Sequence, residues 1–197
     1  MSDLLIASYD EGSAPLTAQE RALLIPSYIS QRRELNEAEQ IGIENADLWA
    51  FSRRRDVLDV RLLRELHRRM FGAVWSWAGE YSRKQQRRIG LDGWQILPAL
   101  QQLVGDGGFW IEHRTFPPDE IAVRFHHRLT QIHPFVKGNG RHSRLATDLL
   151  AVQLGRERFS WGRGGPVEIA DLRRRYMATL HAADGHDIGP LLEFART

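Results

Sequence analysis

The stretch His133-Pro134-Phe135-Val136-Lys137-Gly138-Asn139-Gly140-Arg141-His142-Ser143-Arg144 decides how the chain folds around its candidate site. Apolar residues spaced three and four apart precede it, from Ile121 to Ile132, and the spacing resumes from Leu145 to Val152. This spacing is typical of one face of an amphipathic helix. Proline and glycine interrupt helices, and both occur within the stretch. The sequence therefore predicts two helices joined by a tight loop.

The loop has the composition of an anion-binding site. Gly138 and Gly140 can adopt positive φ angles, so the N–H groups around Asn139 can turn toward one point. The second helix is expected to begin near Arg141, which brings its positive dipole end to the same place. A cation in the first turn of a helix is electrostatically misplaced, and both Arg141 and Arg144 are there. We therefore expect a bound polyanion, such as a di- or triphosphate.

His133 stands at the entrance of this loop. Its unperturbed pKa lies near neutral pH, so beside a phosphate site the imidazole can accept the proton of an attacking hydroxyl group. Lys137 adds a third positive charge. The alternative is a helix–loop–helix with a charged surface, in which His133 merely caps the preceding helix. The residues alone leave both interpretations open.

The stretch closely resembles the signature of Fic-domain proteins, His-Pro-Phe-x-(Asp/Glu)-Gly-Asn-Gly-Arg-x-x-Arg, and departs from it at one fixed position. That family transfers a phosphate-containing group, most often AMP from ATP, to a protein side-chain hydroxyl. The resemblance implies that ATP is the substrate and that His133 is the general base. It also implies a phosphate-binding set made of Gly138, Asn139, Gly140, Arg141 and Arg144, to which Lys137 is added as a candidate on its charge alone.

The departure is Lys137. Family members carry an acidic residue there that holds Mg²⁺, and a lysine cannot ligate a hard divalent cation. Lys137 either replaces the metal as a phosphate-neutralising charge, or it marks a site that binds phosphate but transfers AMP weakly or not at all. No metal ligand is assigned, and Mg²⁺ is a doubtful cofactor.

A candidate inhibitory residue lies in the N-terminal part of the chain. Some Fic proteins carry a helix with a (Ser/Thr)-x-x-x-Glu-(Gly/Asn) motif whose glutamate blocks the γ-phosphate position. Glu44 and Asn45 match its last two positions, whereas Gln40 stands at the Ser/Thr position. The sequence leaves two interpretations: an inhibitory Glu44 paired with Arg144, or a solvated glutamate on a helix surface.

Helical patterns fill most of the chain, so we expect an all-α, Fic-type helical bundle. The expected divisions are an irregular segment over residues 1–15, an N-terminal helical extension over 16–58 and the Fic domain over 59–197. Residues 82–97 carry arginines, glycines and isolated apolar residues, which predict a short β-hairpin. By resemblance this hairpin is the flap that docks a target protein through main-chain pairing.

Composition limits the remaining classes of function. The 197 residues are 42% hydrophobic and 26% charged, contain no cysteine and carry a formal net charge of +2. Absence of cysteine excludes disulfide and zinc-thiolate sites and fits a reducing cytoplasm. No signal peptide or membrane-spanning apolar run is recognised, so we expect a cytoplasmic protein that does not associate with membranes. Basic residues are scattered, so direct nucleic-acid binding is not expected.

Within the superfamily the chain resembles the bacterial group called mobile mystery protein B, through residues 34–37, 67–71 and 110–127. That group is associated with mobile elements and accompanies a small helix-turn-helix protein, which is a candidate partner. Two functions follow. The first is a transferase that modifies a Ser, Thr or Tyr hydroxyl of an unknown target protein, and the second is a catalytically weak nucleotide- or phosphate-binding module serving a mobile element.

Overall fold

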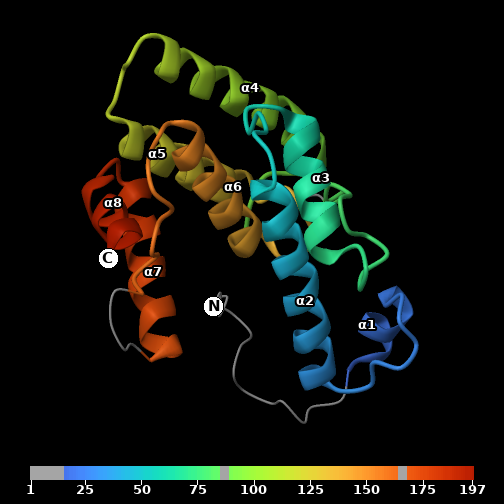
Figure 1. Ribbon diagram of the computed structural model, residues 1–197. Helices are drawn as coiled ribbons and strands as arrows, with labels where there is room; N and C mark the ends of the chain where they lie inside the picture. The colour runs from blue at the N-terminus through green and yellow to red at the C-terminus, as the bar shows by residue number, and fades with distance from the viewer. Residues whose placement is uncertain (1–15, 85–88, 164–167) are drawn as a thin grey trace.

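The computed structural model describes residues 16–84, 89–163 and 168–197 (Figure 1). The expected irregular segment 1–15 lies outside them. The described part of the chain forms eight helices and includes two isolated bridges, Leu24 with Trp75 and Tyr81 with Phe135. This confirms the all-α fold. The helices are α1 (Ala18–Leu23), α2 (Arg32–Phe51), α3 (Val60–Phe71), α4 (Gly93–Glu112), α5 (Pro118–Ile132), α6 (Asn139–Gln153), α7 (Ile169–Asp184) and α8 (Gly189–Arg196).

Helix ends coincide with local signals in the sequence. Thr17 and Glu20 form a reciprocal capping box at the start of α1. The side chain of Asp59 accepts a hydrogen bond from the Arg61 N–H at the start of α3, with an N–O distance of 2.8 Å. Pro118 is the first residue of α5, where a missing N–H costs nothing.

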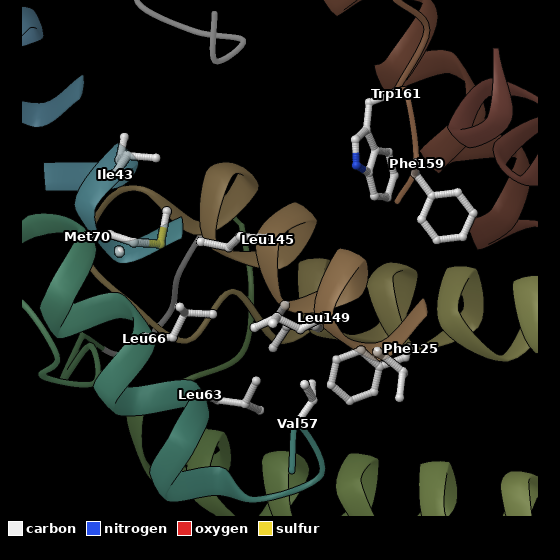
Figure 2. Packing of buried hydrophobic residues seen from close by; sticks show 14 of the residues in the cluster. Ile43, Val57, Leu63, Leu66, Met70, Phe125, Leu145, Leu149, Phe159 and Trp161 are labelled. Atoms are coloured by element: carbon white, nitrogen blue, oxygen red, sulfur yellow. The ribbon is translucent and has the colours of Figure 1, made fainter. Parts of the chain in front are cut away.

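The core is built around α5 and α6, which pack against each other as a helical hairpin (Figure 1). Figure 2 shows how α3 covers α6 through Leu63 and Leu66, while Phe125 projects from α5 toward Leu149 of α6. All four residues are buried, with at most 7% of their surface exposed. The hairpin is therefore held rigidly by apolar packing, and the loop at its end has a fixed platform.

The N-terminal helices pack directly on this core. Helix α2 lies along α3, and the two backbones approach so closely that a Cβ atom on Gly42 would lie 2.5 Å from the Met70 carbonyl oxygen. Glycine is required at such an approach. Ile43 enters the core from the same helix (Figure 2). Helix α2 thus reaches the neighbourhood of the loop that follows α5.

The prediction of a hairpin over residues 82–97 was wrong for its second half. Helix α4 begins at Gly93, so Trp94 and Ile96 are helical. The Asp92 N–H donates to the Gln95 side chain at 3.2 Å, which caps the first turn and favours the helix locally. No strand occurs among residues 82–84 and 89–92, and residues 85–88 lie outside the described structure.

The glycines between residues 105 and 108 do not interrupt α4, which continues to Glu112. None of the helices in the described ranges combines the length and the apolarity that a membrane span requires.

Candidate functional site

The loop between α5 and α6 begins at His133, whose backbone is left-handed with φ 51° and ψ 58°. The His133 N–H still bonds to the Leu129 carbonyl at 3.1 Å, so the helix ends there and the chain reverses sharply. A left-handed conformation is uncommon for a residue with a side chain and is found where surrounding structure enforces it. His133 therefore has a defined position at the mouth of the loop.

Two hydrogen bonds close the loop from inside. The Phe135 N–H donates to Asn139 Oδ1, and Asn139 Nδ2 donates to the Phe135 carbonyl, both at 2.8 Å. Both residues are buried. The Asn139 amide, expected to hold phosphate, is therefore used to brace the loop. At an anion site it contributes its backbone N–H and the loop shape.

Of the two glycines that flank Asn139, Gly138 adopts the positive φ that the sequence permits, whereas Gly140 is the second residue of α6 and does not. Gly138 has φ +81°, and a Cβ there would lie 2.5 Å from the Phe71 ring. Both constraints require glycine. Helix α6 begins at Asn139, so the N–H groups of its first turn, including that of Gly140, point into the loop with the positive end of the helix dipole.

His67, which the sequence analysis did not select, ties the loop to its surroundings. Its Nδ1 accepts from the Gly79 N–H at 3.0 Å, and its Nε2 lies 3.0 Å from the Lys137 carbonyl. Since Nδ1 is an acceptor, the neutral ring carries its proton on Nε2 and donates it to Lys137. The ring also stacks on Phe135, with centroids 3.7 Å apart. Its burial lowers the pKa of His67 and keeps the ring neutral.

Arg141 is bound by a carboxylate. Glu39 of α2 places Oε2 2.6 Å from Arg141 Nη1, and its other oxygen accepts from Trp75 Nε1 at 2.6 Å. The Glu39 and Arg141 side chains are only 5% and 12% exposed. Arg141, one of the two arginines that the sequence assigned to phosphate, is therefore already paired with the Glu39 carboxylate.

Glu44, the candidate inhibitory residue of the sequence, does not take part in this contact. Glu44 is exposed and accepts from Gln40 Nε2 at 2.9 Å, which matches the interpretation of a solvated surface glutamate. Glu39 lies five residues earlier, on the buried face of α2. Residues three and four apart share a helix face and residues five apart do not, so the Glu39 and Glu44 side chains lie on different faces. The signal that could have identified it is the apolar register of Leu35, Gly42 and Ala46.

The two remaining basic residues of the predicted site differ in burial. Arg144 is 4% exposed and lies below the loop, where its guanidinium carbon is 5.4 Å from the centre of the Tyr176 ring. Lys137 is exposed at the outer edge, with Nζ 5.4 Å from the centre of the Trp75 ring. The structure therefore brings together His133, Lys137 and the first turn of α6 around one loop.

The donor set does not fit Mg²⁺. The loop position that would supply a carboxylate oxygen carries the ammonium group of Lys137, and the nearby carboxylate of Glu39 is bound to Arg141 and Trp75. Hard divalent cations need several oxygen ligands. In the described ranges no group of three His, Asp or Glu side chains is arranged to hold a metal ion.

We predict that His67→Phe loosens the loop. Phenylalanine retains a ring against Phe135 but leaves the Gly79 N–H and the Lys137 carbonyl without their partner, which should cost about 2–4 kcal/mol of unfolding free energy. Urea unfolding measures the change. The exposed His113→Phe is the control and should change stability by less than about 0.5 kcal/mol. Equal stability of the two variants would contradict the role given to His67.

Two other buried histidines predict acid sensitivity. Burial lowers the pKa of His126 to about 3 and that of His142 to about 4, from an ordinary value near 6.5. The unfolded chain therefore binds more protons as pH falls below 6.5, and folding loses about 2 kcal/mol per histidine by pH 5. Urea unfolding at pH 7 and pH 5 tests this. An unfolding free energy that is equal at both pH values would contradict it.

Comparisons with known proteins identify relatives of this chain. Residues 57–151 match the model of the Fic/DOC family. The "Protein adenylyltransferase Fic" of Drosophila melanogaster is 30% identical over 194 residues, and that of Aedes aegypti is 28% identical over 195 residues. Each alignment covers 93% of this chain, which spans only 37% of the length of these curated relatives.

Solved structures share the fold. The BepC protein of Bartonella tribocorum with bound AMPPNP gives a TM-score of 0.68 at 18% identity, covering 88% of this chain and 89% of that one. Residues 134–508 of Fic-1 from C. elegans give a TM-score of 0.66 at 23% identity, covering 90% and 52%. The loop motif, the family model and the fold agree that residues 57–151 form a domain of the Fic/DOC family.

Proposed function

We propose that the chain is a Fic-type transferase that moves AMP, or a related phosphate-containing group, from a nucleotide to a hydroxyl of a target protein. The observation that carries the proposal is the ion pair between Glu39 and Arg141 at the N-terminal end of α6. A carboxylate oxygen of Glu39 thus contacts Arg141 beside the helix N-terminus, in the way that we expect a phosphate oxygen of the nucleotide to do. The relatives named protein adenylyltransferase and the related structure with bound AMPPNP support the same assignment.

The chemistry follows from the loop. His133 removes the proton from the target Ser, Thr or Tyr hydroxyl, whose oxygen attacks the α-phosphorus of ATP. A new P–O bond forms, the bond between the α-phosphorus and its bridging oxygen breaks, and pyrophosphate leaves. Amides of the first turn of α6 and the Arg141 guanidinium stabilise the charge that develops on the leaving group. The buried Arg144 side chain supports the first turn of α6 by packing beneath it.

Lys137 supplies the charge that a metal would otherwise supply. Its ammonium group stands at the outer edge of the loop, where it can contact nucleotide phosphates as a point charge. In this proposal ATP binding needs no Mg²⁺. A cytoplasmic target protein, and a small helix-turn-helix protein as a partner, belong to the same proposal.

Glu39 is proposed as the inhibitory residue, in place of Glu44. Because its carboxylate holds Arg141, nucleotide phosphate must displace it before the arginine can bind. Glu39→Gln keeps an oxygen for Trp75 Nε1 but removes the charge that competes with phosphate. We predict that this variant binds ATP about 10-fold to 100-fold more tightly, as expected when one charge-assisted contact is removed from the unbound state. Isothermal titration with ATP measures it.

Matched variants complete this test. Glu44→Gln removes a carboxylate from the exposed face of the same helix and should leave ATP affinity unchanged. Arg141→Ala should abolish binding. If Glu39→Gln and Glu44→Gln bind ATP equally well, Glu39 does not control the site.

The alternative is a catalytically weak Fic-fold module that binds nucleotide or phosphate. Lys137 favours it, because this residue stands where family members carry the metal-binding acid. The variant Lys137→Glu separates the two functions. If the protein is an active transferase, the substitution abolishes transfer of label from α-³²P-ATP to protein. If a silent wild type instead gains Mg²⁺-dependent labelling as Lys137→Glu, the binding-module function is correct. His133→Ala is the control for labelling that does not depend on the loop.

A further inference from the structure

The outer face of α4 carries exposed residues without charge. Helix α4 packs on α5 and α3 through one side, and its other side faces away from the bundle (Figure 1). Trp94 is 71%, Leu97 45% and Phe109 54% exposed. With Pro98, Gln101 and Gly105 they recur every three or four residues and form one stripe, called here the α4 face. A contiguous apolar stripe of this kind marks an interaction surface.

Two glycines of the α4 face, Gly105 and Gly108, are not required by packing within one molecule. Gly107 points inward, and a Cβ there would lie 2.8 Å from Leu58, so packing requires glycine. A Cβ on Gly105 or Gly108 would meet nothing within 4 Å. Glycine weakens a helix interior relative to alanine, and the monomer gains nothing at these two positions. A second helix that approaches closely would fill the space that they leave.

The shape of the face is complementary to itself. Its bulky residues are Trp94 and Leu97 in the first half of the helix and Phe109 near its end. Gly105 and Gly108 lie in the second half and leave two positions without a side chain, called here the glycine hollows. In an antiparallel pair with a two-fold axis beside Gln101, Leu97 of one copy lies opposite Gly105 of the other, and Trp94 lies opposite Gly108. Each copy thus presents the same patch to the other, as a two-fold dimer requires.

Charge at the helix ends favours the same arrangement. Lys84 is exposed beside the first turn, where its carbonyl accepts from the Gly93 N–H at 3.0 Å, and the exposed Glu112 ends the helix. Antiparallel pairing sets each lysine opposite the glutamate of the other copy and opposes the two helix dipoles. We propose that the chain forms a homodimer through its α4 faces, with Trp94 and Leu97 of each copy packed into the glycine hollows of the other.

Sedimentation velocity on the full chain, over a concentration series, tests this proposal. The wild type should show a monomer–dimer equilibrium. The double variant Gly105→Gln with Gly108→Gln should weaken dimerisation at least 10-fold, and so should Trp94→Ala. Glutamine favours helix more than glycine does, so thermal unfolding of the dilute double variant should occur at the same or a higher temperature. Loss of the dimer with no loss of fold separates a contact effect from misfolding.

Leu48→Ala is the matched control, because Leu48 is also 71% exposed but lies on α2. It should leave the dimer intact. A wild type that remains monomeric at several hundred micromolar would overturn the proposal. A dimer that survives the glycine substitutions, or that Leu48→Ala disrupts instead, would place the interface elsewhere and would also overturn it.

Discussion

The paired hydrogen bonds between Asn139 and the backbone of Phe135 constrain the rest of the site. They close the loop on itself, so that His133 at one side and the first turn of α6 at the other face a common point. Phe135 is buried against His67, which in turn holds the Lys137 carbonyl and the Gly79 N–H. The loop is thus connected to α3 and to the segment after it. Such preorganisation places charged groups without further reorganisation when a ligand binds.

A second constraint is electrostatic. Lys137 and Arg141 place positive charge at the N-terminus of α6, where the dipole makes cations unfavourable. The chain itself supplies part of the compensation through Glu39, which bonds to Arg141 and Trp75 while almost fully buried. Burying a charge is costly unless it is paired and hydrogen-bonded, and Glu39 meets both conditions. The same pairing links α2 to the candidate site.

Much of this architecture could be predicted from the sequence, for identifiable reasons. The helices on both sides of the loop have strong periodicity and clear ends, such as Pro118 and Gly138, and the loop itself matched a long motif. Glu39 was missed because its role depends on which face of α2 packs inward, and the motif comparison favoured Glu44. The start of α4 was missed because glycine and arginine around residues 83–93 outweighed the local capping by Gln95. His67 was not selected because its partners, Gly79 and Lys137, are backbone groups distant in sequence.

In the proposed function, nucleotide phosphate replaces the Glu39 carboxylate at Arg141. The indole N–H of Trp75 reports on this directly, because it donates to Glu39. Its resonance can be assigned in a ¹H–¹⁵N spectrum with Trp75→Phe and followed while ATP is added. We expect the Trp75 resonance to shift as ATP saturates the wild type and to stay fixed when ATP is added to Arg141→Ala. If ATP binds the wild type while the Trp75 resonance does not move, Glu39 remains on Arg141 and the claim is wrong.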